Sequence, residues 1–556
     1  MPTTIIVGGV AGGASCAARL RRLDESRRIV IVERGPHVSF ANCGLPYYVG
    51  DVIQDEAKLL VTTPESLISR FNLEVRVLTE AVAIDAAAKT LTLREVEGGR
   101  EYQESYDELV LSPGAKPLRP ALPGLDLPGV FTIRNVPDAL RVRRFIDGHA
   151  QPDALRAVVV GGGFIGMEMA ENLRLRGVAV ELVEGGPQVM PPLDPDLARL
   201  IQGRMAEHQV GLHLHALLQG VEVSANGLRV RARRGETDLE LTADLVVLAI
   251  GVQPENGLAK AAGCELGPRG HIVVDDHMRS SVPHIFAVGD AVQVRDAVSG
   301  APTAVPLAGP ANRQGRVAAD VIAGRDGRSA RFRGTQATAV LGAFGLIAAS
   351  TGLSAKSCVA QGIAHATARL HPGDHVGYYP GAKPIHLQLV FDPHTRRVLG
   401  AQAVGEQGVD KRIDVIAMAI QMGATVDDLA EAELCYAPQF GAAKDAVNLA
   451  GMIAANHCDG LSPLARLEEV DPTRDVVVDV RPSGSSQPPC WAAVQSIPLT
   501  ELRQRHRELP QDRPVYVLCN VGQTAHNATR MLRQYGIDAR NLSGGERSLE
   551  LLGGCG

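Results

Sequence analysis

A single thiol stands in a short stretch whose neighbours could expose it for redox chemistry. Residues 39–48 read Ser-Phe-Ala-Asn-Cys-Gly-Leu-Pro-Tyr-Tyr, with Cys43 near the middle. A redox cysteine must be exposed and easily deprotonated. Gly44 permits close backbone approach, and Pro46 is expected to keep the run from becoming an ordinary helix. Because free cysteine is also common in protein cores, this stretch alone leaves a structural role for Cys43 open.

A glycine-rich turn precedes this stretch. An apolar run at residues 3–7 leads into Gly8-Gly9-Val10-Ala11-Gly12-Gly13, then a helix, then a second apolar run at residues 29–32. In a dinucleotide-binding β-α-β unit the glycines allow a tight turn, the helix N-terminus faces the pyrophosphate, and an acid after the second strand binds ribose hydroxyls. Val10 stands at the middle glycine position, so the match is imperfect. The predicted cofactor-binding residues are Gly8, Gly12, Gly13 and Glu33.

The same pattern occurs a second time. Residues 157–160 precede a complete Gly-x-Gly-x-x-Gly turn at residues 161–166, a helix at residues 167–175 and a strand at residues 179–183. The predicted cofactor-binding residues here are Gly161, Gly163, Gly166 and Glu184. An acid at this position favours NAD over NADP, although Arg174 and Arg176 precede the strand and leave the choice open. Two copies predict two dinucleotides, with ligand-free glycine turns as the alternative.

Two later strands end where a flavin could be bound. Residues 106–115 read as a strand and a tight turn that ends at Ala115, and residues 284–291 read as a strand that meets a helix start. Asp290 could hydrogen-bond the ribityl chain, and the loop and helix at residues 307–317 could lie under an isoalloxazine ring. Ala115 and Asp290 are therefore predicted cofactor contacts.

With these motifs, the chain resembles the two-dinucleotide-binding flavoprotein disulfide reductases. The resemblance implies FAD at the first turn, NAD(P)H at the second and a dimerisation domain from about residue 335 to residue 455. The residues around Cys43 resemble the coenzyme A-disulfide reductase branch. The glutathione reductase branch has two cysteines separated by four residues and a His–Glu pair, whereas this chain has only Cys43 and reads Glu-Leu-Cys-Tyr-Ala-Pro at residues 433–438.

The same resemblance implies a coenzyme A site and two further catalytic residues. The implied coenzyme A ligands are Arg19, Arg22, Ser39, Asn42 and Lys444, and the implied catalytic tyrosines are Tyr378 and Tyr436. Arg19 and Arg22 are spaced to share one helical face, which suits the ADP phosphates. Tyr378 and Tyr436 could donate hydrogen bonds to a sulfur anion across the dimer interface. A solvated basic face and half-buried core tyrosines are the alternatives.

The C-terminal region resembles a rhodanese domain. Strand-like runs at residues 475–481 and 514–518 precede a turn into a helix at residues 519–525. Cys519 is the implied sulfur carrier, because backbone N–H groups and a helix N-terminus at such a turn stabilise a thiolate or persulfide. The turn has no Arg or Lys, which weakens the case for an anionic donor such as thiosulfate. Residues 483–494 match the family poorly, so an inert domain is the alternative.

These observations predict an α/β protein with two Rossmann-like dinucleotide-binding domains, an α+β dimerisation domain and a C-terminal α/β rhodanese domain. The expected boundaries are residues 1–150 with 255–330 for FAD, 151–254 for NAD(P)H, 331–455 for dimerisation, 456–470 for a linker and 471–556 for the rhodanese domain.

Composition excludes several classes of protein. The 556 residues carry a formal net charge of −6, which gives no general case for binding nucleic acid. No apolar run reaches membrane-spanning length, and Met1-Pro2 leads directly into a strand, so a cytoplasmic location without membrane contact is expected. The nine cysteines contain no Cys-x-x-Cys pair, so neither a metal site nor a dithiol motif is predicted.

The leading hypothesis is an FAD-dependent homodimeric reductase that uses NAD(P)H to cleave sulfur–sulfur bonds of small molecules. Cys43 would attack a coenzyme A persulfide, a polysulfide or coenzyme A disulfide, and the rhodanese domain favours the first two. Cys519 would accept sulfane sulfur, and coenzyme A would carry it between the sites, since only residues 457–469 are expected to move. The alternatives are an NADH oxidase in which Cys43 cycles through sulfenic acid, and a non-catalytic flavin-bearing sulfur carrier or redox sensor.

Overall fold

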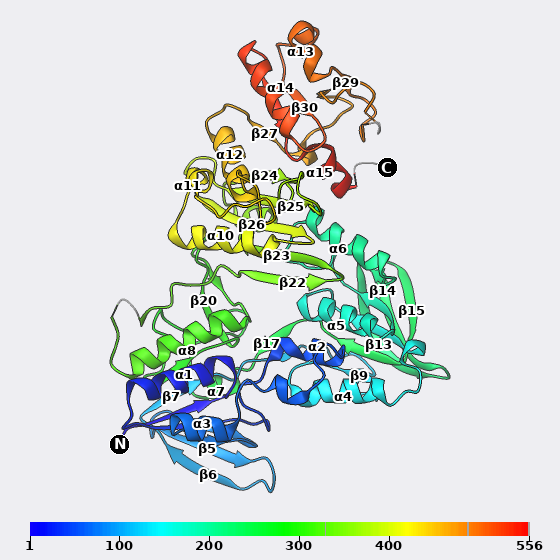
Figure 1. The fold of residues 1–556 in the computed structure, drawn as a ribbon. Coiled ribbons are helices and arrows are strands. Elements are labelled where there is room, and N and C mark those ends of the chain that lie inside the picture. Colours follow the sequence, from blue (N-terminus) through cyan, green and yellow to red (C-terminus); the bar gives the residue numbers. More distant parts are fainter. Residues whose placement is uncertain (328–329, 486–488, 554–556) are drawn as a thin grey trace. The chain divides into compact units, whose positions relative to one another are not determined.

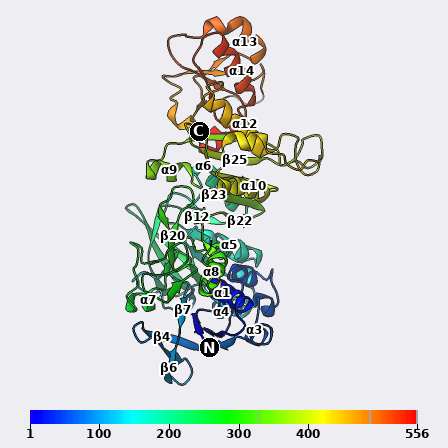
Figure 2. The same cartoon turned by 90° about the vertical axis from the view of Figure 1, so that its left-hand side faces the viewer.

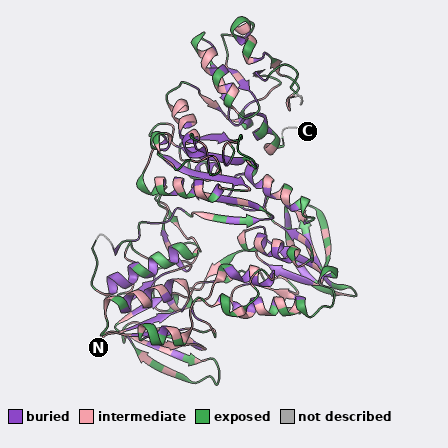
Figure 3. Ribbon diagram, in the orientation of Figure 1, coloured by how far each residue is buried: buried purple, intermediate pink, exposed green. Residues whose placement is uncertain are grey.

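The computed structural model describes residues 1–327, 330–485 and 489–553, and the chain forms two compact units (Figure 1). The first unit comprises Met1–Pro187 and Gln209–Thr335, and the second comprises Gln188–His208 and Gln336–Gly556. Strands at the centre of each unit are buried, whereas the helices beside them expose one side (Figure 3).

A five-stranded parallel sheet in the first unit has the strand order β19-β7-β1-β2-β3. Its strands are β1 (Thr3–Val7), β2 (Arg28–Val32), β3 (Glu74–Arg76), β7 (Glu108–Leu111) and β19 (Ile285–Ala287). The central strands are short runs of Val, Ile and Leu, which is typical of parallel strands covered on both faces. The sheet brings residues 285–287 beside residues 109–111, which in turn pair with the N-terminal strand β1.

Two glycine-containing helices pack closely beside this sheet. Helix α1 (Ala11–Leu23) contacts α8 (Ala308–Ile322). A Cβ atom at Gly315 would lie 2.2 Å from the carbonyl oxygen of Gly12, so a side chain there would force the helices apart. The segment expected as a loop and helix at residues 307–317 is a helix that continues to Ile322.

A second five-stranded parallel sheet has the order β12-β11-β10-β16-β9. Its strands are β9 (Val130–Phe131), β10 (Arg156–Val160), β11 (Ala179–Val183), β12 (Gly211–His213) and β16 (Leu245–Leu248), and α5 (Phe164–Leu175) connects β10 to β11. Strand β9 precedes residue 151, so the sheet extends outside the expected domain of residues 151–254. Helix α6 (Pro195–Glu207), within that expected domain, belongs to the second unit.

Smaller elements complete the first unit. The antiparallel strands are β4 (Thr79–Asp85), β5 (Thr90–Glu95) and β6 (Glu101–Ser105); β13 (Ala216–Ser224), β14 (Gly227–Arg234) and β15 (Thr237–Ala243); β20 (Val292–Arg295) and β21 (Pro302–Thr303); and β8 (Ala115–Pro117) with β17 (Val252–Pro254). Strand β18 (Ile272–Val273) pairs in parallel with β20. The helices are α2 (Leu45–Val49), α3 (Pro64–Phe71), α4 (Val136–Asp147) and α7 (Gly257–Ala261).

The second unit begins with an antiparallel sheet of order β22-β23-β26-β25-β24. Its strands are β22 (Ala339–Ala343), β23 (Leu346–Gly352), β24 (Ala366–Leu370), β25 (Ile385–Phe391) and β26 (Val398–Gly405). Every residue of β25 and β26 is buried, so both faces of the sheet centre are covered. The helices are α9 (Ala355–Gln361), α10 (Val409–Met422), α11 (Val426–Glu431) and α12 (Ala446–Cys458).

A parallel sheet of order β27-β31-β30-β28-β29 forms the C-terminal part of the second unit. Its strands are β27 (Leu464–Ala465), β28 (Val476–Asp479), β29 (Gln495–Ser496), β30 (Val515–Leu518) and β31 (Ala539–Leu542). Helices α13 (Leu499–Arg505) and α14 (Gln523–Gln534) lie side by side (Figures 1 and 2), and α15 (Gly545–Leu552) follows β31.

The segment expected as a linker, residues 456–470, takes part in folded elements. Helix α12 extends to Cys458, and β27 pairs with β31 in the C-terminal sheet. His457 Nδ1 accepts a hydrogen bond from the Leu464 N–H at 2.9 Å. Sequence-based reasoning treated residues 457–469 as the movable part; within this segment, Leu464 and Ala465 pair with β31 of the C-terminal sheet.

The predicted fold class is confirmed: two parallel five-stranded sheets, a mixed α+β region and a C-terminal α/β region are all present. The part of the chain that the structure describes contains no helix long and apolar enough to cross a membrane.

A buried ion pair in the second unit yields a stability prediction. Arg412 Nη2 lies 2.8 Å from Asp445 Oδ2, both side chains are 3% exposed, and Asp445 also caps α12. Asp445→Ala should lower stability by about 3–5 kcal/mol, because it leaves a buried guanidinium without its carboxylate. The measurement is chemical denaturation. Thr425→Ala, which removes the cap of α11 without unpairing a buried charge, should cost only about 1 kcal/mol. Equal losses of stability in Asp445→Ala and Thr425→Ala would show that the first loss does not come from the broken ion pair.

Candidate active site

The two glycine turns share one backbone geometry. Gly8 and Gly161 have φ of +98° and +107°, in the region that favours glycine. A Cβ atom at Gly13 would lie 1.9 Å from the Gly8 carbonyl oxygen, and one at Gly166 would lie 1.8 Å from the Gly161 carbonyl oxygen. The last glycine of each turn therefore lets the helix pack against the strand end.

Each turn also has an acid that binds its backbone. Glu33 accepts hydrogen bonds from the Gly9 and Gly35 N–H groups at 2.9 and 2.8 Å. Glu184 accepts from the Gly162 and Gly186 N–H groups at 2.7 and 2.6 Å. Both carboxylates thus lie beside the glycine turn, where ribose hydroxyls are bound in dinucleotide sites.

The middle position of the pattern is Val10 in the first turn and Gly163 in the second, and Gly12 lies two residues after Val10. A Cβ atom at Gly163 would meet no other atom within 4 Å, so this side of the turn is open to a pyrophosphate group. Gly12 has a packing role, because a Cβ atom there would lie 3.0 Å from Val288 and 3.1 Å from the Ser112 hydroxyl. The tight turns, the open backbone and the acids fit a dinucleotide at each position.

Cys43 lies in a short 3-10 turn, Asn42–Gly44, immediately before α2, and is exposed. Pro46 was expected to prevent a helix here, but it occupies the first turn of α2. That position needs no intrahelical N–H bond, so proline is tolerated there.

The groups around Cys43 are acidic. Burial raises the pKa of the Cys43 thiol, and the charges of Glu168 and Asp290 raise it further. The expectation of an easily deprotonated thiol is therefore not met by the chain's own groups, which favour the protonated form. Asp290 follows a strand of the first sheet and Glu168 lies on the helix of the second turn, so the thiol faces acids from both dinucleotide-type regions.

Sequence-based reasoning missed Glu168, which lies two residues after Gly166 on α5. Burial and the charge of Glu171 raise its pKa to about 7, although a hydrogen bond with the Tyr47 hydroxyl opposes the rise. Burial and, after it, the charge of Glu168 raise the pKa of Tyr47 to about 12. An acid inside an otherwise apolar helical run was the signal available in the sequence.

Arg134 is a second missed residue. The side-chain amide of Asn42, oriented to bond both neighbours, connects to Arg134. Its oxygen accepts a hydrogen bond from Arg134 Nη1 at 3.0 Å, and its nitrogen donates one to the Phe40 carbonyl at 3.3 Å. Burial raises the pKa of Asp290, and Arg134 opposes that rise. Arg134 therefore connects the Cys43 turn with the predicted flavin acid. Ala115, the other predicted flavin contact, is buried and pairs with Pro254.

Of the implied coenzyme A ligands of the first unit, Arg19 and Arg22 lie in the C-terminal half of α1, and Ser39 contacts the first glycine turn. Arg19 is held by Asp320 of α8, with Nη2 to Oδ1 at 2.7 Å, whereas Arg22 is exposed and its guanidinium lies 5.8 Å from the Phe71 ring. The Ser39 N–H donates to the Gly9 carbonyl at 2.8 Å. Arg22 is thus the freer of the two cations for a phosphate.

In the second unit, the Tyr378 and Tyr436 hydroxyls lie 2.9 Å apart. The side chains are 74% and 47% exposed, which argues against the alternative of half-buried core tyrosines. Tyr436 also lines a cavity of about 440 Å³ next to Cys435, an exposed thiol that sequence-based reasoning did not consider. Lys444 is exposed just before the cap of α12.

Cys519 lies at the end of β30 in a cradle of N–H groups. Its Sγ accepts from the Gly522 and Ala525 N–H groups at 3.2 and 3.3 Å, and the residue is only 2% exposed. The turn itself has no cation, as the sequence shows, but Arg481 at the end of β28 lies close by. The pKa of Arg481 is raised mainly by its hydrogen bond to Asp479, and the charge of Cys519 adds to this rise. Folding thus supplies a cation from another strand.

No group of three or more His, Cys, Asp or Glu side chains within residues 1–327, 330–485 and 489–553 is placed to hold a metal ion.

The glycine geometry predicts that two neighbouring substitutions act differently. Gly166→Ala should lower the thermal unfolding midpoint, because its Cβ atom would overlap the Gly161 carbonyl. Gly163→Ala should leave stability within about 0.5 kcal/mol, yet raise the NADH concentration needed for half-maximal flavin reduction, because its methyl group would occupy the open face of the turn. Unfolding scans and NADH titrations of both variants test this. Equal destabilisation by the two would show that Gly163 is also a packing position.

The acids around Cys43 predict a pH-dependent effect of Glu168→Gln. Removing this negative charge should lower the pKa of Cys43 and speed its alkylation by iodoacetamide at about pH 8 by roughly threefold or more. At about pH 5.5 the two rates should converge, because Glu168, with a pKa of about 7, is already protonated in the unmodified protein. The surface variant Glu95→Gln should change neither rate. An undiminished difference at the lower pH would refute the electrostatic explanation.

Comparisons with known proteins match this arrangement. Residues 2–315 match the model of the pyridine nucleotide-disulphide oxidoreductases, and residues 342–447 match the dimerisation domain of the same family. The coenzyme A disulfide reductase of Staphylococcus epidermidis is 34% identical over 451 residues, which cover 81% of this chain and 99% of that protein.

Solved structures extend the similarity to the C-terminal region. The reduced CoADR-RHD of Bacillus anthracis has a TM-score of 0.95 and 44% identity, covering 100% of this chain and 98% of that one. The NAD-dependent persulfide reductase from A. fulgidus has a TM-score of 0.88 and 34% identity over 98% of this chain and 99% of that one. The predicted family and its C-terminal rhodanese domain are confirmed. The chain belongs to the pyridine nucleotide-disulphide oxidoreductase family, in the coenzyme A disulfide reductase branch that carries a rhodanese domain.

Proposed function

We propose that this chain is an FAD-dependent reductase that uses NAD(P)H to reduce the sulfur–sulfur bonds of coenzyme A persulfide, polysulfide or coenzyme A disulfide. One observation carries the proposal: Cys43, an exposed thiol, lies within the electrostatic influence of Asp290 beside the first dinucleotide-type sheet and of Glu168 on the helix of the second. A thiol between two dinucleotide turns is suited to receive electrons from one nucleotide through the other. The named relatives reduce coenzyme A disulfide and persulfide, which supports the same substrate class here.

FAD at the first turn and NAD(P)H at the second, the cofactors of this family, supply the two electrons of the reduction. Cys43, as the thiolate, attacks one sulfur of the substrate; the sulfur–sulfur bond breaks, and the other sulfur leaves as an anion. Cys43 then holds a mixed disulfide or persulfide; the two electrons would break this sulfur–sulfur bond, regenerate the Cys43 thiolate and release the bound group as a thiol or the outer sulfur as hydrogen sulfide. Glu168, with a pKa of about 7, can hold or release a proton beside this sulfur near neutral pH.

The remaining site residues would recognise coenzyme A. Arg19, Arg22 and Lys444 provide cations for its phosphates, and Ser39 and Asn42 border the Cys43 turn. The Tyr378 and Tyr436 hydroxyls, already in contact with each other, could donate to the leaving sulfur anion. The dimerisation domain supports a homodimer, and we infer that these tyrosines act on Cys43 of the partner subunit.

The rhodanese domain favours sulfane sulfur as the substrate. We infer that Cys519 accepts sulfur from a donor and that coenzyme A carries it to Cys43. The pairing of β27 with β31 and the bonding of His457 leave little freedom in residues 457–469 for the domain to deliver sulfur itself. A flexible pantetheine arm removes the need for such a movement.

A second candidate is an NADH oxidase. The water-forming NADH oxidase from Lactobacillus brevis has a TM-score of 0.78 and 28% identity, covering 83% of this chain and 99% of that one. This similarity is lower than that of the reductases and does not cover the whole chain. A non-catalytic carrier is not retained, because the named relatives are enzymes.

The function is tested by steady-state NADH oxidation with coenzyme A persulfide, polysulfide, coenzyme A disulfide and oxygen. Cys43→Ser should abolish turnover with every sulfur acceptor while flavin reduction by NADH persists, because only the acceptor step uses this thiol. Cys519→Ser should spare preformed small persulfides and slow turnover from a larger or less reactive donor. Faster oxygen turnover than persulfide turnover in the unmodified protein would favour the oxidase, and equal loss with all donors in Cys519→Ser would place Cys519 in the central cycle.

A further inference from the structure

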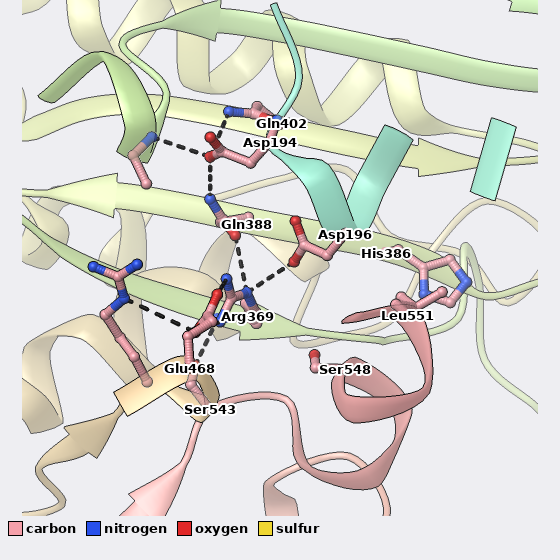
Figure 4. A network of polar contacts seen from close by, with 12 residues as sticks. Asp194, Asp196, Arg369, His386, Gln388, Gln402, Glu468, Ser543, Ser548 and Leu551 are labelled. Atoms are coloured by element: carbon pink, nitrogen blue, oxygen red, sulfur yellow. Dashed lines mark hydrogen bonds and ion pairs between the residues drawn. The ribbon is translucent and has the colours of Figure 1, made fainter. Parts of the chain in front are cut away.

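Strand β24 carries an arginine that contacts two segments of the rhodanese region at once. The Arg369 N–H donates to the Ser543 hydroxyl at 2.8 Å, and its guanidinium binds both carboxylate oxygens of Glu468 at 2.6 and 3.2 Å (Figure 4). Ser543 follows β31, and Glu468 follows β27, the neighbour of β31 in the sheet. Arg369 is therefore a clamp between the dimerisation sheet and one edge of the rhodanese sheet.

The loop that Arg369 contacts also contacts the backbone of Cys519. The Glu546 N–H donates to the Cys519 carbonyl at 2.9 Å, and the Arg547 N–H donates to the Asn520 carbonyl at 3.0 Å. A Cβ atom at Gly545 would lie 2.1 Å from the Cys519 carbonyl oxygen. Because no space separates the two segments, a shift of residues 543–547 must also move the Cys519 turn.

Further contacts fix the other side of this loop. A Cβ atom at Gly544 would lie 3.0 Å from the Arg369 Cβ, and His371 Nε2 lies 2.8 Å from the Ser548 hydroxyl. The His371 and His386 Nδ1 atoms lie 3.0 Å apart. Burial lowers the pKa of His371 to about 3 and that of His386 to about 4. Both rings are therefore neutral near pH 7, and their contacts do not titrate there.

The charges make Arg369 hard to replace. Its side chain is 6% exposed, and Nε contacts Asp196 Oδ2 at 2.8 Å and Gln388 Oε1 at 3.0 Å. Burial raises the pKa of Asp196, and among the described residues its Oδ1 atom has no hydrogen-bond partner. Arg466 reaches Glu468 only at 3.9 Å. Loss of the guanidinium would leave the buried Asp196 carboxylate and the partly exposed Glu468 carboxylate without their shared cation.

We propose that Arg369, although it belongs to the dimerisation sheet, is a positioning residue for Cys519. It acts by bracing residues 543–547, and through them it sets the orientation of the Cys519 turn and of the N–H groups that point at Sγ. The inference depends on the proposed sulfur-carrier function. In that step the Cys519 thiolate attacks the terminal sulfur of a donor R–S–S⁻, the donor bond breaks, R–S⁻ leaves, and Cys519 holds the persulfide with no net oxidation.

The test is sulfur loading of Cys519 in the full-length protein, with inorganic polysulfide as donor and peptide mass spectrometry as readout. Arg369→Met should lower the loading rate at saturating donor by about tenfold or more, because a small misplacement of a reacting group has a large kinetic effect. The donor concentration for half-maximal rate should change by less than about twofold, because Arg369 does not touch the donor. Ser543→Ala, which changes no charge, should lower the rate in the same way but less.

Two variants separate positioning from folding. Arg369→Met combined with Asp196→Asn and Glu468→Gln removes the unpaired charges, so it should restore the thermal midpoint but not the loading rate. Arg396→Gln removes a guanidinium held by Asp427 and Asp459 elsewhere in the dimerisation domain, and its loading should be unchanged. Cys519→Ser gives the background.

Each result decides between the explanations. Recovery of loading in the triple variant, or equal loss in Arg396→Gln, would show that charge or general stability, rather than bracing, controls Cys519, and would overturn the inference. Normal loading in Arg369→Met would overturn the inference alone. An unmodified protein that places no sulfur on Cys519 would overturn both the carrier function and the inference that depends on it.

Discussion

Two contacts between a glycine Cα and a carbonyl oxygen determine most of the first unit. At Gly13 and at Gly166 the helix backbone approaches the strand end so closely that a methyl group would overlap the carbonyl oxygen. This close approach fixes where each helix begins. It therefore also fixes the direction of the first N–H groups and of the positive end of the helix dipole. The acids Glu33 and Glu184 bind the same turns. Because both turns obey the same constraint, the chain has two glycine turns with the same close helix–strand approach, each of which fits a dinucleotide.

The two proposed sulfur sites use opposite electrostatics. Burial and, after it, the charges of Glu168 and Asp290 raise the pKa of Cys43, so its thiolate depends on groups other than these side chains. Cys519 is buried, but its sulfur receives two backbone N–H groups, and Arg481 lies nearby. An anionic persulfide is stabilised by such a cradle. The first environment suits a thiol controlled by its cofactors, and the second suits a carrier that keeps an anionic sulfur.

The second unit joins two regions that the sequence suggested were separated by a movable linker. Strand β27 adds to the rhodanese sheet, and Glu468 just after it binds Arg369 of the neighbouring antiparallel sheet. Buried ion pairs are costly unless their geometry is good; the guanidinium of Arg369 also contacts Asp196 and Gln388, while its backbone N–H donates to Ser543. Sulfur transfer by a diffusible carrier is consistent with this attachment, because the carrier moves while the domain does not.

The sequence by itself determined the β-α-β units, the glycine turns with their acids, the lone Cys43 and the thiol at the turn before α14. These are local patterns, in which spacing along the chain fixes geometry over a few residues. Tertiary structure decided the rest. Glu168 and Arg481 act on Cys43 and Cys519 from distant elements, Arg134 bonds Asn42 beside Cys43, and their charge effects depend on burial that no local pattern records. Pro46 lies in the first turn of a helix that it was expected to prevent, and Leu464 and Ala465 of the expected linker pair with a sheet, because strand pairing depends on partners far away in the sequence.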